Sequence, residues 1–85
     1  MRDKTTGFPL VKVTWVDAIS TVEWLSTEEA FDFAKTSDWE VHETGWLLVK
    51  TKEFILIASQ FQKGGSWGNI TKIPTSWVHK IQVLR

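Results

Sequence analysis

The stretch LVKVTWVD, residues 10–17, sets the class of fold that this sequence predicts. Apolar Val11, Val13 and Trp15 alternate with polar residues, which is the two-residue period of a strand with one buried face. We therefore expect a strand over 10–17 whose odd-numbered side chains face a core. Val16 falls on the opposite face, so that face is not wholly polar.

Two more strands are expected in the middle of the chain. Residues 39–51 predict the second strand, in which Gly45 marks a bulge or a sharp bend. Its core face would carry Trp39, Val41, Leu47 and Val49, and its other face His42, Thr44, Trp46 and Leu48. Residues 54–61 predict a third strand that is apolar on both faces, which indicates cover on both sides by a helix or a partner subunit.

The run Ser26-Thr27-Glu28-Glu29 is the clearest local signal. The Ser26 side chain can accept from the free amides of a helix start, and the Glu29 side chain can reach back to the Ser26 amide. We expect a helix from there to about Lys35. A helix of two to three turns needs tertiary packing to persist. Before it, we expect residues 18–25 to form a partly extended excursion that brings Trp24 and Leu25 back to the core.

The last part of the chain predicts a Gly-rich loop over 62–69, a short strand over 70–73, one turn of 3₁₀ helix over 74–77 and a closing strand over 78–84. The expected order is strand, short helix, then four strands. A mainly β, five-stranded small barrel of the SH3-like or Sm-like type fits this order, with the helix between strands 1 and 2. Residues 1–9 would be a flexible lead and 10–85 a single domain.

The composition describes a small chain with large core residues. The 85 residues include six Trp and five Phe and no Cys. Disulfides and thiolate metal sites are therefore excluded, and the lack of disulfides in so small a domain is typical of the cytoplasm. Residues 1–7 carry no apolar run typical of a signal peptide, and no segment is long and apolar enough for a membrane span.

The charges balance overall but shift along the chain. Ten Lys and Arg face ten Asp and Glu, which argues against a protein whose main task is to grip a nucleic-acid backbone. Residues 17–43 hold eight acidic side chains and one Lys, whereas residues 50–85 hold six basic side chains and one Glu. The pattern leaves open whether these charges form separate faces.

Three motifs resemble the sequences of a group of small phage proteins. They are VKVTWVDA at 11–18 with Trp24 before the helix start, GWLLVK at 45–50, and IPTSWVHKI at 73–81. The resemblance covers nearly all of the expected domain. It implies a phage origin, a host-cell cytoplasmic location and an SH3-like or Sm-like barrel, and it carries over no catalytic or binding residue.

No catalytic or metal-binding constellation is visible in the sequence. Ser20, His42 and Asp17 have no spacing that links them as nucleophile, base and orienting acid. His42 and His79 sit among polar residues of expected strands, where a half-exposed imidazole is the simpler interpretation. There is no His-x-His and no calcium-type loop. We expect a protein that is not an enzyme and has no cofactor or metal.

The Gly-rich loop is the most suggestive segment for binding. Its glycines expose backbone amides, Lys63 adds charge and Trp67 offers a ring for stacking. The candidate ligand contacts are Lys63, Gly64, Gly65, Trp67 and Asn69. The alternative is a hairpin loop whose Trp67 packs on the body of the protein.

A second candidate surface is an interface for self-association. It comprises Val16, Trp46 and Leu48, which are apolar on the face away from the expected core. The alternative is that the helix covers them.

Together these features predict a phage accessory protein that binds and neutralises a host component, either a host protein or a nucleotide-type signal, and that forms a homo-oligomer. A nucleic-acid-binding module is the alternative function.

Overall fold

The computed structural model describes residues 2–17, 22–35 and 40–85, and it contains five antiparallel strands in one sheet. The strand order is β4-β3-β2-β1-β5. In chain order the elements are β1 (Leu10–Val16), α1 (Thr27–Ala34), β2 (Glu40–Lys50), β3 (Phe54–Gln62), β4 (Ser66–Pro74), the 3₁₀ turn η1 (Thr75–Trp77) and β5 (Val78–Val83). The prediction of a mainly β fold with one helix between the first two strands is confirmed.

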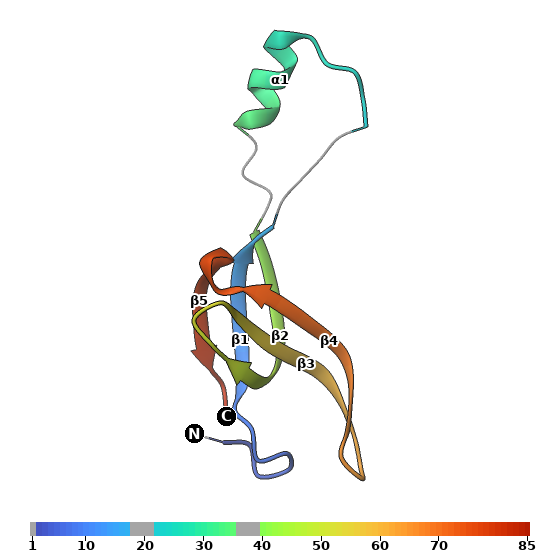
Figure 1. The fold of residues 1–85 in the computed structure, drawn as a ribbon, viewed down its shortest axis with the longest axis vertical. Coiled ribbons are helices and arrows are strands. Elements are labelled where there is room, and N and C mark those ends of the chain that lie inside the picture. The colour runs from blue at the N-terminus through green and yellow to red at the C-terminus, as the bar shows by residue number, and fades with distance from the viewer. Residues whose placement is uncertain (1, 18–21, 36–39) are drawn as a thin grey trace.

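The sheet is open, so the closed barrel expected from the sequence is not what the strand pairing forms. In the described part of the chain, β4 and β5 are the two edges. β3 and β4 run obliquely to β1 and β5 in Figure 1, as expected of a strongly twisted sheet. The η1 turn leads directly into β5, as the proline at position 74 predicts.

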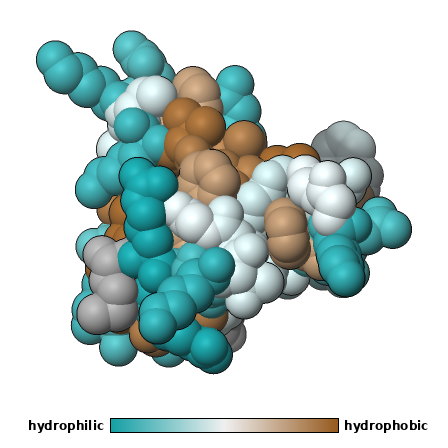
Figure 2. Space-filling model, turned by 90° about the horizontal axis from the view of Figure 1, so that it is seen from below, coloured by the Kyte–Doolittle hydropathy of each residue, from teal (hydrophilic) through white to brown (hydrophobic). Residues whose placement is uncertain are grey.

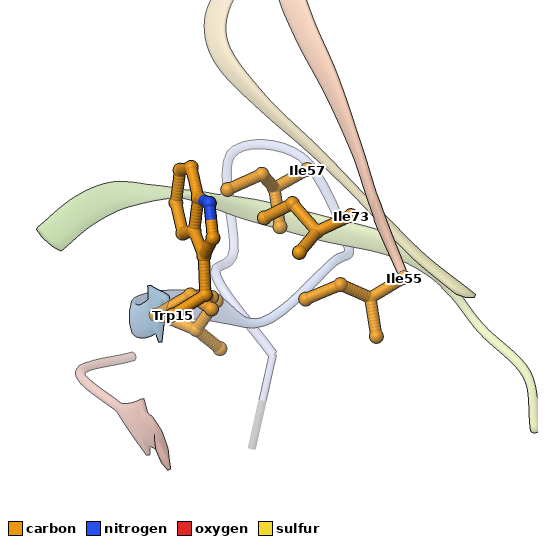
Figure 3. Packing of buried hydrophobic residues seen from close by; sticks show 6 residues of the cluster. Trp15, Ile55, Ile57 and Ile73 are labelled. Atoms are coloured by element: carbon orange, nitrogen blue, oxygen red, sulfur yellow. The ribbon is translucent and has the colours of Figure 1, made fainter. Parts of the chain in front are cut away.

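The core lies on one face of this twisted sheet and is made from alternate residues of its strands. Val11, Val13 and Trp15 of β1 are buried, which confirms the predicted register. Figure 3 shows Trp15 beside three isoleucines from β3 and β4, namely Ile55, Ile57 and Ile73. Because β-branched side chains pack well on a pleated surface, these residues also favour the strand conformation.

β2 bends so that it can pair with β1 on one side and with β3 on the other. Gly45 is buried, and a Cβ at this position would lie 2.6 Å from the Ala58 carbonyl oxygen of β3. The irregularity in pairing is not at Gly45 but between Leu47 and Val49, where Leu48 is the extra residue. Because of this bulge, the prediction that Val49 lies on the core face of β2 was wrong. Val49 pairs with Leu56 and is exposed. Trp39 lies outside the described residues.

The β3–β4 hairpin is longer than the sequence predicted. β3 continues to Gln62 and β4 begins at Ser66, so only residues 63–65 form the turn. Gly64 and Gly65 have φ of 112° and 105°, a region in which a residue with a Cβ is strained. The expected long loop was wrong because polar residues after the glycines pair as regular strand.

Helix α1 begins where the sequence predicted. The Glu29 amide donates to the Ser26 hydroxyl and the Ser26 amide donates to a Glu29 carboxylate oxygen, each at 3.1 Å, which completes the capping box. No residue of the helix is buried. In Figure 1 it stands apart from the sheet, at the end opposite the termini. The expectation that this excursion returns Trp24 to the core is wrong, because Trp24 is 101% exposed, while Leu25 is half-buried.

Residues 3–8 form a hydrogen-bonded loop in front of β1. The Asp3 amide donates to the Phe8 carbonyl at 2.8 Å, and the Gly7 amide donates to the Asp3 carbonyl at 2.7 Å. The C-terminal residues lie beside the same end of β1, where the Leu84 amide donates to the Leu10 carbonyl at 2.7 Å. The two ends of the chain therefore meet at one end of the sheet, as Figure 1 shows.

Candidate functional site

A polar groove crosses the solvent-facing side of β1, β2 and β5, away from the core. Lys12 and Thr14 of β1 face outward because Val11, Val13 and Trp15 face inward. Strand pairing sets Thr14 opposite His42 on one side and opposite Lys80 on the other. Residues directly opposite each other in antiparallel strands share a face, so these side chains meet on one surface.

The groove has a volume of about 360 Å³. Small-molecule sites commonly measure about 300–1,000 Å³, so the groove has room for a small ligand. Its lining is wholly polar and includes both histidines of the chain: Lys12, Thr14, Glu40, His42, His79, Lys80 and Gln82. A polar lining of this kind favours a small charged ligand over an apolar one.

His42 is held from both sides. Its Nδ1 lies 3.1 Å from the Thr14 hydroxyl, and its Nε2 lies 3.0 Å from a Glu40 carboxylate oxygen. These two contacts fix the plane of the imidazole ring. The side chains of His42 and Glu40 are each about half exposed, so water competes for both contacts and each contributes little to stability.

The cationic side chains give the groove its chemical character. Lys12 and Lys80 carry positive charges. Glu40, whose carboxylate contacts His42, carries a negative charge. His79 and the Gln82 amide add hydrogen-bonding groups. The ammonium groups of the two lysines, the His79 imidazole and the Gln82 amide around one hollow suit a phosphate or carboxylate group.

Sequence reasoning missed this groove although its signal was present. The outward positions of the first, second and fifth strands are polar, and two of them are His42 and Lys80. Each is an ordinary solvent-facing residue by itself. Only the strand order, which inserts β1 between β2 and β5, brings them together.

The predicted ligand residue Trp67 lies in an aromatic cluster of four rings, comprising Phe8, Trp46, Phe61 and Trp67. The Trp67 ring centroid is 4.7 Å from that of Phe61, 5.6 Å from that of Phe8 and 5.8 Å from that of Trp46. Trp67 is half-buried. The sequence left open whether Trp67 contacts a ligand or packs on the body of the protein. Most of the Trp67 surface packs on the body of the protein.

The other predicted ligand residues lie at separate places along the hairpin. Lys63, Gly64 and Gly65 form the exposed turn. Asn69 lies in β4, where its side-chain amide donates to the Ser59 hydroxyl at 2.5 Å. A hollow of about 290 Å³ lies on this hairpin, lined by Gln60, Phe61, Gln62, Ser66, Trp67 and Gly68. Ligand binding by the hairpin stays a prediction.

The three predicted interface residues lie in different surroundings, and the helix does not cover them. Trp46 joins the aromatic cluster, Leu48 is the half-buried bulge residue, and Val16 is half-buried at the end of β1. Helix α1, none of whose residues is buried, does not cover them. Trp46, predicted as an interface residue, and Trp67, predicted as a ligand residue, are therefore neighbours.

Asp3 lies at the end of the molecule that carries the aromatic cluster. The Thr5 amide donates to its carboxylate at 2.8 Å and holds the pKa of Asp3 below its ordinary value; burial opposes this shift. The Trp46 indole, the Thr5 hydroxyl and the charge of Arg85 also lower this pKa. The indole N–H of Trp46 is itself buried, without a hydrogen bond of full geometry. Figure 2 views this end and shows hydrophobic residues exposed between hydrophilic ones.

Over residues 2–17, 22–35 and 40–85, no three acidic or histidine side chains gather as metal ligands. Within the same ranges, no helix has the length and apolar character needed to cross a bilayer.

No protein-family model matches the chain, and no curated protein and no solved structure shows significant similarity to it. The resemblance to small phage proteins therefore stays a prediction from the sequence motifs.

Proposed function

We propose that this protein is a non-enzymatic binding protein that captures a small anionic ligand of nucleotide type in the groove on β1, β2 and β5. The observation that carries the proposal is the convergence of Lys12, Lys80 and both histidines on one polar hollow. A phosphate group is the ligand chemistry that this set of donors matches best, since lysine binds phosphate as a point charge and neighbouring donors orient it.

The shape of the groove limits how tightly such a ligand is held. An open hollow on a sheet face leaves part of the ligand in water, so less surface is buried than in an enclosed pocket. We expect dissociation constants on the order of micromolar, since only the surplus over the entropic cost of association appears as affinity. Neutralisation of a host signal would then depend on a high concentration of the protein.

The biological setting of the proposal comes from the sequence resemblance. A phage-encoded protein in the host cytoplasm that captures a nucleotide-type signal would neutralise a host response. The strand order β4-β3-β2-β1-β5 and the η1 turn before β5 support an SH3-like or Sm-like classification. A host protein as the target is the second form of this proposal, for which the exposed aromatic residues are the supporting feature.

The non-enzymatic part of the proposal rests on the surroundings of His42. A hydroxyl, an imidazole and a carboxylate stand in the order found in hydrolase triads. Catalytic groups gain their strength from fixed dipoles in a site that excludes water. His42 and Glu40 are about half exposed, so the arrangement suits the positioning of a ring for binding.

A nucleic-acid-binding module is the alternative, and the charge distribution favours it in one respect. The sheet and its flanking residues, 2–17 and 40–85, hold nine basic and five acidic side chains, a net charge of +4. A polynucleotide contacts several cations at once, so its affinity falls more steeply with salt than that of a mononucleotide. Titrations at two salt concentrations separate the two functions.

The direct test is isothermal titration with AMP, a cyclic dinucleotide, inorganic phosphate and a single-stranded oligonucleotide. We expect the nucleotides to bind, and Lys12→Ala or Lys80→Ala to weaken binding about 10- to 150-fold, since one hydrogen bond to a charged group contributes about 1.5–3 kcal/mol. Lys63→Ala is the matched control, because Lys63 is an exposed lysine on the hairpin turn.

Two results would contradict the groove as the site. If Lys63→Ala and Gln62→Ala weaken binding while Lys12→Ala and Lys80→Ala do not, the ligand binds at the hairpin. If none of the four probes binds at millimolar concentration, capture of a nucleotide-type ligand is wrong and the host-protein form of the proposal remains.

A further inference from the structure

The segment 22–35, here called the arm, exposes large apolar side chains to solvent. Trp24 is 101% exposed and Phe31 is 64% exposed. Ala34 follows Phe31 by three residues and Ala30 by four, so it shares one face of α1 with both. A helix of eight residues is not stable in water by itself, so this apolar face requires a partner surface.

The sheet carries an apolar surface that is partly exposed, although Ala58 within it is fully buried and Trp46 packs in the aromatic cluster. Two rows of paired residues cross it: Val49, Leu56 and Lys72 form one row, and Trp46, Ala58 and Ile70 form the next. We call these six residues the outer face. Ile70 is 52% exposed and Val49 is also exposed. The bulge at Leu48 creates this surface, because it turns Val49 outward beside Leu56.

The charges of the arm and of the sheet are opposite. The arm holds Glu23, Glu28, Glu29, Asp32 and a single Lys35, a net charge of −3, while residues 2–17 and 40–85 carry +4. On the outer face itself, Lys72 lies over the Phe54 ring, with its Nζ 4.3 Å from the ring centroid. An acidic apolar helix and an apolar surface that presents a lysine are complementary in both respects.

We propose that the arm of one copy docks on the outer face of a second copy, and that the exchange is reciprocal, giving a two-fold symmetric dimer. Phe31 and Trp24 would contact the row of Ile70 and the row of Leu56, and Asp32 or Glu28 would pair with Lys72. Each contact occurs twice in a two-fold dimer, so one weak docking surface counts twice.

The area available is sufficient for a stable dimer. A buried aromatic side chain removes about 150–250 Å² from water, so four aromatics on two arms remove about 600–1,000 Å². The facing surfaces lose a similar area, which brings the total to about 1,200–2,000 Å², the range of stable protein interfaces. The chain's own sheet does not cover the arm, which favours the second copy as the partner.

The test uses the absence of cysteine from the chain. The single variants Phe31→Cys and Ile70→Cys are mixed under mild oxidation and analysed by non-reducing electrophoresis and mass spectrometry. We expect a disulfide-linked pair of one Phe31→Cys chain and one Ile70→Cys chain. The double variant at low concentration reports the other possibility, because a disulfide within a single chain would show that the arm folds onto its own sheet and would overturn the proposal.

The unmodified dimer is measured by analytical ultracentrifugation over a range of concentrations. We expect Ile70→Thr and Phe31→Ser each to raise the dimer dissociation constant about tenfold, the usual effect of losing a central apolar contact. Val83→Thr is the matched control, since Val83 is 54% exposed on edge strand β5. A monomer at millimolar concentration, or a dimer equally sensitive to Val83→Thr, would overturn the proposal.

A charge exchange sharpens the test. Lys72→Glu should dissociate the dimer, and adding Asp32→Lys or Glu28→Lys on the arm should restore it. Restoration by either arm variant identifies which carboxylate faces Lys72. If Lys72→Glu leaves the dimer intact, Lys72 is not at the interface and the docking surface is wrong. If Lys72→Glu dissociates the dimer and neither arm variant restores it, the pairing of the arm with Lys72 is wrong.

Discussion

Strand β1 and the arm each contain a tryptophan, nine residues apart, and the two side chains have opposite surroundings. Trp15 is 7% exposed and packs among the isoleucines of β3 and β4, whereas Trp24 is fully exposed. Both were expected in the core. The alternation around Trp15 ties it to a strand, and the strand pairs on both sides.

The difference shows what a local pattern can and cannot specify. The capping box at Ser26 sets where α1 begins, and the structure has it as expected. A cap, however, says nothing about which surface the helix packs on. Strand register carries that information, because the period of two points alternate side chains to one side of a sheet.

The largest expected effect separates the two tryptophans. Trp15→Ala should cost about 3–5 kcal/mol of unfolding free energy, since it removes an aromatic ring from a core. Trp24→Ala should change it by less than about 0.5 kcal/mol, as for other exposed side chains. Urea unfolding at low protein concentration, where the monomer dominates, measures both. Equal losses would mean that the arm packs on the sheet.

Gly45 tests the bend in β2. Gly45→Ala should cost about 2–3 kcal/mol, because its new methyl group would meet the Ala58 carbonyl at 2.6 Å and backbone must move. Gly68→Ala is the control, since its methyl group would meet only the end of the Gln60 side chain, at 2.9 Å. Thermal unfolding compares them, and similar melting temperatures would contradict the close approach of β2 and β3.

Trp67 lies between the two tryptophans of the opening comparison in its degree of burial. Trp67→Ala should cost about 1.5–2.5 kcal/mol, because it removes three aromatic pairs, each contributing about 0.5–1.5 kcal/mol beyond its buried area, and part of the ring is in water. Chemical denaturation measures the loss, and nucleotide titration of the same variant measures binding. Unchanged stability with lost binding would favour the hairpin as a ligand site.

The smallest expected effect is the pH dependence of α1. The Ser26 backbone amide holds the pKa of Glu29 below its ordinary value of 4.5. A lowered carboxyl pKa means that the capping box stabilises the helix fully above about pH 4.5 and loses this effect as the pH falls through the lowered pKa. NMR chemical shifts of the helix amides between pH 6 and pH 2 report the loss. Glu29→Gln should abolish this transition, because it removes the titrating carboxyl group, and an identical titration in that variant would contradict the assignment.

Much of the fold could be predicted because strand alternation and helix capping are local. The five strands, the helix and the η1 turn were expected within a few residues of where they lie. The long Gly-rich loop was wrong because Trp67 and Gly68 do not show the alternation of a strand, although they pair with Phe61 and Gln60. The face of Val49 was wrong because a bulge leaves no mark in a run of apolar residues.

The candidate sites depended on tertiary structure to a much greater extent. By itself, the sequence determined which residues alternate, where α1 begins and that the arm is acidic, since these are properties of neighbouring residues. Only the tertiary structure decided that Trp67 joins Phe8, Trp46 and Phe61, and that polar residues of β1, β2 and β5 form one groove. The physical reason is that strand order places side chains from distant segments side by side, and strand order is set by how the whole sheet buries its apolar face.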